Sequence, residues 1–397
     1  MDLNQLKLEI NSLSIFDSIL EEDVFICLNN LLREKDLESY ISYYCQLCSA
    51  IYKENGSLSR YIYNYVMNDE NVYILQKAKQ KHVSKVIEQS LERELKILQK
   101  VADLKSEDVL KDTACSISLP IWDNDNLDLV KDYHQRILEL PKKGYGLFAK
   151  YYVFGVDENG LFPIKHPDKQ ALSEMTGYES QRSLLIKNTL ALLQGMNANN
   201  ALLYGDAGTG KSSSIKAIVN EYHDQGLRLI EVKKKQISHL PDVLESLSNN
   251  PLKFIVFIDD LSFSSNDDDY IALKNILEGG TTSNQRNIVI YATSNRRHFM
   301  KETFSDRNGD ELHRNDTIQE TMSLAARFGL TITFQKPGKN LYMDIVRSYA
   351  KEYGLEMDEQ ELSIKAEAFA IRNNGRSPRT AKQFVEYEKI NQTITEE

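Results

Sequence analysis

Eight residues near the middle of the chain constrain its fold more than any other segment. Residues 205–212 read GDAGTGKS and match the phosphate-binding pattern G-x-x-x-x-G-K-[ST] at every fixed position. A mostly apolar run, NALLY at 200–204, precedes them, and a helix-compatible segment at 213–222 follows. Strand, glycine-rich loop and helix in this order is the context that the pattern requires. Because glycine is uncommon, a chance match in a chain this long is on the order of one in a hundred.

The residue types of this loop suit a polyphosphate. Glycine has no Cβ, so Gly205, Gly208 and Gly210 can adopt positive φ and let phosphates approach the main chain. A helix that begins near Lys211 points unpaired N–H groups and its positive dipole end at the same place. Lys211 adds a cation for the terminal phosphates, and the Ser212 hydroxyl is placed to ligate Mg²⁺. The residues expected to hold the phosphates are Gly205, Asp206, Ala207, Gly208, Thr209, Gly210, Lys211, Ser212 and Ser213.

Length and composition bound the class of protein. The chain has 397 residues, enough for two or three domains with cores of their own. No uninterrupted apolar run is long enough to span a bilayer, and the first residues lack the basic start and apolar core of a signal peptide. We therefore expect a cytoplasmic protein with no membrane partner. The net charge of −10 argues against a broad nucleic-acid surface, although a local basic channel stays open as an alternative.

The cysteines give one local pattern. Cys45 and Cys48 form a C-x-x-C, which is half of a metal site or a redox pair in some proteins. No second C-x-x-C or H-x-x-H follows to complete a zinc site. The surrounding residues, YISYYCQLC at 40–48, read as one apolar helix face. We expect buried helix cysteines here.

Proline and glycine divide the chain into parts. Residues 1–119 contain no proline and one glycine, and their apolar residues recur at spacings of three and four, which predicts a run of helices. Residues 147–164 read as extended chain around a turn, and a strongly periodic helix is expected at 179–193. The expected parts are an N-terminal helical domain at 1–146, an extended linker or hairpin at 147–171, an α/β core at 172–335 and a C-terminal helical lid at 336–397.

A second apolar run ends in two acids. Residues 254–258 read FIVFI and are followed by Asp259 and Asp260. Continuous β-branched and aromatic residues predict a strand buried on both faces, as in a parallel sheet, and acids at its tip would lie at the ligand-binding edge. With the glycine loop upstream, we expect Asp259 to hold Mg²⁺ and Asp260 to orient or deprotonate an attacking water. The alternative is a strand end whose acids only favour the next loop.

Two further segments carry single polar residues at the ends of apolar ones. NIVIYATSN at 287–295 predicts another buried strand that ends in Asn295, whose amide can touch both a γ-phosphate and a water. SLAARFGL at 323–330 places Arg327 before an apolar strand expected at 330–334.

A late helix contributes one more arginine. GRSPR at 375–379 places Ser377 as N-cap, Pro378 at the first helical position and Arg379 in the first turn. For Arg379, as for Arg327, the alternative is a surface charge or a partner for a carboxylate. Another charged run, KKK at 233–235, is expected in a solvated loop, with a pore or DNA contact as the alternative.

These motifs in this order resemble the AAA+ ATPase superfamily over residues 172–390. The finer resemblance is to a bacterial ATP-binding family within it, known as domain of unknown function 815. The segments that carry the resemblance are MTGYE at 175–179, NNALLYG at 199–205, FIDDLSF at 257–263, LEGG at 277–280, ATSNRRH at 292–298 and GRS at 375–377.

The resemblance implies an α/β fold: a P-loop AAA+ core with a parallel sheet flanked by helices, a C-terminal helical lid and a mainly α-helical N-terminal domain. It also implies ATP and Mg²⁺ as cofactors and a homo-oligomer, with Asn295 as sensor 1, Arg379 as sensor 2 and Arg327 as an arginine finger on a neighbouring subunit's ATP. Tyr178, in the segment 176–179, would lie near the adenine. The expected catalytic residues are Asp260, Asn295, Arg327 and Arg379; the expected metal ligands are Ser212 and Asp259.

One departure bears on the expected activity. Most AAA+ proteins carry an Asp-Glu pair at the acid tip, whereas this chain carries Asp259 and Asp260. The second carboxylate is one methylene shorter, which shifts water positioning by about an ångström and slows hydrolysis. We expect an ATPase that couples binding and hydrolysis of Mg-ATP to remodelling or switching of a macromolecular partner, with an unknown protein as that partner. The alternatives are a DNA- or replication-associated loader and an ATP-dependent binding switch with little turnover.

Overall fold

The computed structural model describes residues 2–79, 81–111, 117–262, 268–278, 286–295 and 324–395. The chain forms two compact units, Met1–Lys150 and Tyr151–Glu397. Parts of three motif segments, at 263, 279–280 and 296–298, lie outside the described residues. No helix in the described part of the chain is long and apolar enough to cross a membrane.

The first unit is helical, as the spacing of its apolar residues predicts. On α6, Leu91, Leu95 and Leu98 are all buried, so the three-and-four spacing marks the face that packs on the neighbouring helices. The elements of this unit are α1 (Leu3–Ile10), η1 (Asp17–Glu21), α2 (Asp23–Leu31), α3 (Leu37–Tyr52), α4 (Leu58–Asn68), α5 (Val72–Ala78), α6 (Lys85–Ala102), α7 (Ser106–Leu110), α8 (Leu129–Leu138), α9 (Leu140–Lys143) and α10 (Leu147–Lys150).

The C-x-x-C of α3 is only half buried, which corrects the expectation of two buried cysteines. Cys48 is buried, whereas Cys45 is exposed. The buried stripe of α3 follows Tyr44, Leu47, Cys48 and Ile51, and Cys45 lies one step of about 100° away from Tyr44, outside that stripe. Among the described residues, no group of three His, Cys, Asp or Glu side chains is placed to hold a metal ion.

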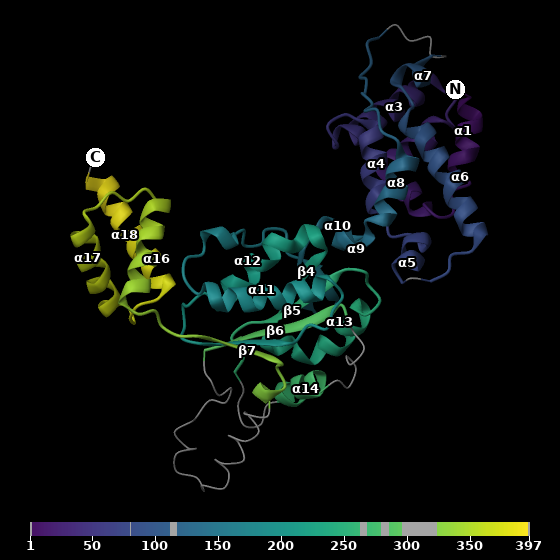
Figure 1. The fold of residues 1–397 in the computed structure, drawn as a ribbon. Coiled ribbons are helices and arrows are strands. Elements are labelled where there is room, and N and C mark those ends of the chain that lie inside the picture. The colour runs from purple at the N-terminus through teal and green to yellow at the C-terminus, as the bar shows by residue number, and fades with distance from the viewer. Residues whose placement is uncertain are drawn as a thin grey trace. The chain divides into compact units, whose positions relative to one another are not determined.

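The second unit contains a seven-stranded sheet with the strand order β2-β1-β4-β5-β6-β3-β7 in its described residues (Figure 1). All neighbouring pairs are parallel except β1 and β2. The strands are β1 (Val153–Asp157), β2 (Gly160–Pro163), β3 (Ala201–Gly205), β4 (Leu227–Val232), β5 (Lys253–Ile258), β6 (Ile288–Ser294) and β7 (Leu330–Phe334). Because β3, β5 and β6 run in the same direction, their carboxyl ends meet at one edge of the sheet.

Helices cover both faces of this sheet, as Figure 1 shows. On one face α11 (Glu179–Leu193) and α12 (Lys211–Tyr222) pack against alternate strand residues such as Leu203, Ile255 and Tyr291. On the other face lie α13 (Leu240–Leu247) and α14 (Asp268–Leu277). The helix over 179–193 has the bounds expected from the sequence, although its apolar residues are not gathered on one face. Three short 3₁₀ helices connect the elements: η2 (Leu172–Glu174), η3 (His223–Gln225) and η4 (Lys234–His239).

Two local expectations differ from the structure. Residues 147–150 form the short helix α10 instead of extended chain, since none of LFAK is β-branched. The lysine run 233–235 leads into η4 and is not a plain loop, because the Lys233 N–H is capped by the Gln236 side chain at 2.9 Å.

The turn expected at 157–160 joins β1 and β2, and β1 pairs with β4 to extend the main sheet.

Three helices at the C-terminus form a small bundle with its own core, which we call the lid. They are α16 (Lys339–Glu352), α17 (Glu359–Arg372) and α18 (Pro378–Thr395). Tyr342 and Val346 of α16, Ala366 of α17 and Phe384 of α18 are fully or almost fully buried together. The structure confirms the predicted fold class: a mostly parallel sheet flanked by helices, followed by a helical lid and preceded by a helical N-terminal unit.

Candidate functional site

The glycine loop connects the end of β3 to the start of α12. Gly205, Gly208 and Gly210 have φ values of 136°, 77° and 90°, which are costly for residues with a Cβ. At Gly205 a Cβ would also lie 2.0 Å from the carbonyl oxygen of Phe334. The loop therefore requires glycine for its shape, and α12 begins at Lys211 with its N-terminal N–H groups at the loop.

Lys211 is drawn into the loop. Its side chain is buried, and Nζ donates to the carbonyl oxygens of Gly205 and Asp206, at 2.9 and 2.8 Å, and to Asn295 Oδ1 at 3.0 Å. Burial lowers the pKa of Lys211, and nearby carboxylates oppose this effect. An anion bound beside Nζ would favour the charged form of the lysine.

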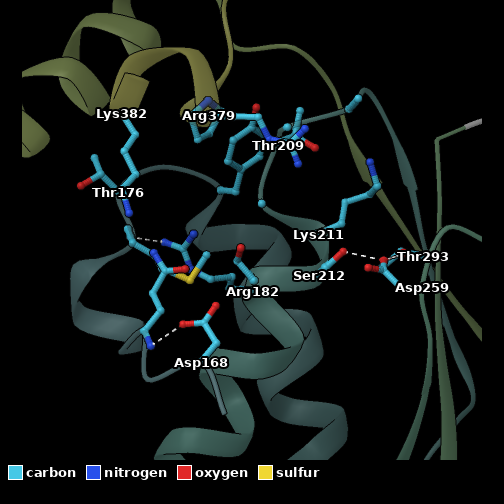
Figure 2. A pocket seen from close by; sticks show the side chains of 18 of the residues that line it. Asp168, Thr176, Arg182, Thr209, Lys211, Ser212, Asp259, Thr293, Arg379 and Lys382 are labelled. Carbon is cyan, nitrogen blue, oxygen red and sulfur yellow. Dashed lines mark hydrogen bonds between the residues drawn. The ribbon is translucent and has the colours of Figure 1, made fainter. Parts of the chain in front are cut away.

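Asp259 at the tip of β5 meets hydroxyls from two other elements. Its Oδ1 accepts from Ser212 Oγ at 2.7 Å and from Thr293 Oγ1 at 2.5 Å. The three side chains lie close together in Figure 2. They meet because α12 starts at Lys211 and the carboxyl ends of β5 and β6 lie at the same edge of the sheet. This donor set consists of oxygens, the ligand type that Mg²⁺ prefers.

Asp260 is held in an unusual backbone conformation. Its φ is 52°, a left-handed value that is uncommon outside glycine but is tolerated best by Asn and Asp. Its N–H donates to Thr293 Oγ1 at 3.0 Å, and its Oδ1 accepts from Asn295 Nδ2 at 2.8 Å. Asn295 thus touches Lys211 with one end of its amide and Asp260 with the other, so the three side chains form one chain of hydrogen bonds.

A cavity of about 560 Å³ opens over these groups. In Figure 2, Lys211, Ser212 and Asp259 lie toward one end of the cavity, and Thr176 and Lys382 lie toward the other. The sequence-predicted residues that line it are Tyr178, Ala207, Gly208, Thr209, Gly210, Lys211, Ser212, Ser213, Asp259, Asp260, Asn295 and Arg379. Gly205 and Asp206 belong to the same loop without lining the cavity, and Arg327 lies elsewhere.

Tyr178 comes from the segment before α11. It is buried, has φ 59°, stacks on Phe334 with a centroid distance of 5.3 Å, and donates its hydroxyl to the Gln335 carbonyl at 2.6 Å. Burial raises the pKa of Tyr178 to about 12, so the hydroxyl stays protonated and acts as a donor at neutral pH.

Arg379 reaches the cavity from the lid. It lies in the first turn of α18, where Ser377 Oγ accepts from the Thr380 N–H at 3.0 Å as an N-cap. The Arg379 N–H lies 3.3 Å from the Gly208 carbonyl, so the lid touches the glycine loop directly.

Arg327 is not brought into this cavity. It lies shortly before β7 and forms an ion pair with Glu278, which follows α14. β7 runs parallel to β3, with Leu330 opposite Ala201, so Arg327 lies near the amino edge of the sheet while the loop follows the carboxyl edge. A five-residue strand spans roughly 16 Å, more than an arginine side chain can reach.

Several residues that line the cavity were not predicted from the sequence. Thr293 lies two residues before Asn295 and Lys382 three residues after Arg379, so strand and helix periodicity could have found both. Arg182 gave no such signal: it is buried, and its guanidinium donates to the Met175 carbonyl at 2.7 Å.

Comparison with known proteins gives one family match. Residues 149–391 match a family described as protein of unknown function (DUF815). No curated protein matches the chain. Among solved structures, the RuvB Holliday junction branch migration motor of Thermotoga maritima is similar at 17% identity and a TM-score of 0.40, over 57% of this chain and 66% of that chain. A structure described as the structural basis for katanin self-assembly is similar at 15% identity and a TM-score of 0.34, over 56% of this chain and 72% of that chain.

The match to RuvB therefore spans less than two thirds of that chain. The family match, in contrast, extends over more than half of this chain and contains every residue that lines the cavity. It also confirms the family resemblance found from the motifs. This protein belongs to the family described as protein of unknown function (DUF815).

Proposed function

We propose that this protein is an ATPase of the AAA+ type that binds Mg-ATP in the 560 Å³ cavity. The observation that carries the proposal is the hydrogen-bonded network of Lys211, Ser212, Asp259, Asp260 and Asn295 beneath a glycine loop at a helix N-terminus. These groups supply, within one cavity, the parts that phosphoryl transfer needs: cations and N–H groups for phosphates, oxygens for Mg²⁺, and a carboxylate for water.

The cavity suits a nucleoside triphosphate. Its volume falls in the range of small-molecule and cofactor sites. The loop and the start of α12 offer N–H groups, and Lys211 and Arg379 offer positive charge from the core and from the lid. In our assignment the phosphates lie against the loop, and the nucleoside extends toward Thr176 and Tyr178.

The residues present fit Mg²⁺. Ser212 and Asp259 would hold it, with phosphate oxygens and waters completing the octahedral shell that this ion prefers. Bound there, Mg²⁺ supplies positive charge that offsets the charge on the phosphates.

We assign the chemical step to Asp260. Its carboxylate would orient a water and accept its proton as the water oxygen bonds to the γ-phosphorus. The bond from that phosphorus to the bridging oxygen breaks, and ADP and phosphate leave. Asn295 keeps the Asp260 carboxylate at its place and offers its amide to the water or the γ-phosphate.

The protein would work as a homo-oligomer in which Arg327 completes the site of a neighbouring subunit. Support comes from its distance to the loop of its own subunit and from its place before the edge strand β7. Nucleotide state would then be transmitted to a macromolecular partner, for which we propose a protein. The net charge of −10 does not favour the DNA-loader alternative.

A second candidate is an ATP-dependent switch with little turnover. The observation that favours it is Asp260 itself, a short carboxylate at φ 52° that is already hydrogen-bonded to Asn295. ATP binding is common to both functions, and the rate of hydrolysis separates them.

The test measures ATP binding by calorimetry and phosphate release for the wild type, Lys211→Ala and Asp260→Asn. Lys216→Ala is the matched control, because Lys216 lies on the same helix and pairs with Glu231 at 2.8 Å outside the cavity. We expect Lys211→Ala to weaken ATP binding by about tenfold or more. Asp260→Asn should keep binding and lower turnover by about 10² or more. The proposal is wrong if the wild type binds ATP no better than Lys211→Ala and releases no phosphate at any protein concentration.

A further inference from the structure

The loop and the lid are joined through one side chain. Residues 335–338, which we call the lid connector, link the end of β7 at Phe334 to the start of α16. Asp206 contacts this region twice. Its N–H donates to the Phe334 carbonyl at 2.9 Å, and its carboxylate oxygen Oδ2 accepts from the Lys336 N–H, also at 2.9 Å. The carboxylate therefore bonds to the backbone of the lid connector itself.

The contact continues from the connector into the lid. Lys336 Nζ donates to the carbonyl oxygen of Asn374 at 3.1 Å. Asn374 has φ 64° and lies in the turn that leads to the N-cap Ser377 and to Arg379. A path of two hydrogen bonds thus runs from the glycine loop, through Lys336, to the turn that places Arg379.

Asp206 also contacts the phosphate-binding lysine. Its carbonyl oxygen accepts from Lys211 Nζ at 2.8 Å and from Thr209 Oγ1 at 2.8 Å. The same residue thus holds the lysine through its backbone and the connector through its side chain. It occupies a variable position of the loop pattern and does not line the cavity. Its carboxylate bonds to the Lys336 N–H and not to the cavity, so direct contact with a nucleotide does not account for this residue.

We propose that Asp206 is a positioning residue for ATP turnover, whose carboxylate ties the phosphate-binding loop to the lid connector and so sets the lid arginine Arg379 at the cavity. This inference rests on the proposed function, because turnover is what it acts on. Lys336 is the second member of the path, since its N–H meets the loop and its side chain meets the lid.

The experiment uses the full chain and compares Asp206→Ala, Asp206→Asn, Lys336→Ala and Asp206→Ala/Lys336→Ala. Asp224→Ala is the matched control: Asp224 follows the far end of α12, about 18 Å along the helix from the loop. Three quantities are measured for each variant: the affinity for ATP, kcat for phosphate release, and amide hydrogen exchange of a peptide that contains Lys336.

The carboxylate and its replacements lead to distinct expectations. Asp206→Ala should lower kcat by about tenfold with ATP affinity within about threefold of wild type, and the Lys336 amide should exchange faster. Asp206→Asn should keep most of the wild-type kcat and most of the wild-type protection of the Lys336 amide, because the asparagine Oδ1 still accepts the Lys336 N–H. The double variant should lose no more than the larger single loss, because both substitutions interrupt one path.

Each result has a separate meaning. A wild-type kcat for Asp206→Ala despite faster exchange would overturn this inference and leave the proposed function standing. The inference would also be overturned if the losses of kcat in the two single variants multiplied in the double variant. It would likewise be overturned if kcat of Asp224→Ala fell as far as that of Asp206→Ala. If the wild type bound no ATP, the proposed function would fail as well, and the exchange of Lys336 would still report on the bond to Asp206.

Discussion

At the scale of single residues, Glu94 shows how one buried carboxylate can organise the first unit. It is fully buried on α6, where its Oε2 accepts from the N–H groups of Ile15 and Phe16, at 2.8 and 3.1 Å. Its Oε1 accepts from the N–H and hydroxyl of Ser14, at 3.0 and 2.7 Å. The N–H groups of residues 14–16, which precede η1, thus receive their acceptors from a side chain about 80 positions away.

Glu94→Gln should therefore destabilise the first unit by about 2–3 kcal/mol, because an amide offers only one acceptor oxygen and its NH₂ would face N–H donors. Glu92→Gln, two residues earlier and half exposed, is the control and should stay within about 0.5 kcal/mol of wild type. Urea unfolding followed by the fluorescence of Trp122, the single tryptophan, measures both. Equal losses for the two variants would contradict this account of Glu94.

Gly205 offers a matched test of close approach in the second unit. Gly205→Ala places a Cβ 2.0 Å from the Phe334 carbonyl at φ 136°, whereas Gly195→Ala meets nothing within 4 Å at φ 72°. We expect about 1 kcal/mol of destabilisation for Gly195→Ala and about 3 kcal/mol or more for Gly205→Ala. Thermal unfolding followed by circular dichroism measures the destabilisation of each variant. The two variants should be equally destabilised if Gly205 is needed only for its positive φ and not for the close approach of Phe334.

The residue scale also shows why the sequence predicts the site only in part. Lys211, Asp259 and Asn295 follow local patterns of strand, loop and helix, so their meeting at one sheet edge is predictable. The Asp206–Lys336 bond joins residues 130 positions apart. The Glu94 contacts with residues 14–16 likewise depend on how distant segments pack. No periodicity or motif in a single sequence encodes such pairs, because each depends on the finished tertiary structure.

At the scale of secondary structure elements, the start of α18 links stability to the site. Ser377 caps this helix, and Asp358 caps α17 by accepting from the Gln360 N–H at 2.9 Å. Ser377→Ala and Asp358→Ala should each cost the lid about 1 kcal/mol. Only Ser377→Ala should also weaken ATP binding, because Arg379 lies in the first turn of α18 and lines the cavity. Binding and unfolding measured on both variants test this, and equal effects on ATP binding would argue against a role for the α18 terminus.

Element boundaries were predictable where strong patterns ran the length of the element. The continuous apolar run at 254–258, for example, predicts all of β5 except its first residue, Lys253. A linker or hairpin was expected at 147–171, but not that the hairpin joins the main sheet, because this depends on pairing of β1 with β4, which the local sequence does not specify.

At the scale of the whole molecule, the family match and the division into units nearly coincide. The match begins at residue 149, and the second unit begins at Tyr151. The cavity, its lid and the path through Lys336 all lie within this second unit. The proposed ATP chemistry therefore belongs to the second unit, and the helical first unit lies almost entirely outside the family match.

The proposed assembly makes its own prediction, because a site completed by a neighbour can be rebuilt from two defective chains. Lys211→Ala removes the lysine that we propose binds phosphate, and Arg327→Ala removes the arginine that we propose acts on the adjacent subunit. Each variant alone should hydrolyse ATP at about a hundredth of the wild-type rate or less. In a random equal mixture, about one site in four combines an intact Lys211 with a neighbour's intact Arg327, so activity should return to about a quarter of wild type.

Glu278→Gln serves as the control, since it removes the ion-pair partner of Arg327 while it keeps the arginine. Its rate of ATP hydrolysis should stay close to wild type. The loss of activity in Arg327→Ala would then be due to the missing arginine and not to the missing ion pair. Phosphate release is measured before and after mixing, at a protein concentration where sedimentation shows the assembled form. If the mixture stays as inactive as its components although subunits exchange, Arg327 does not act across an interface, and its pairing with Glu278 is then structural.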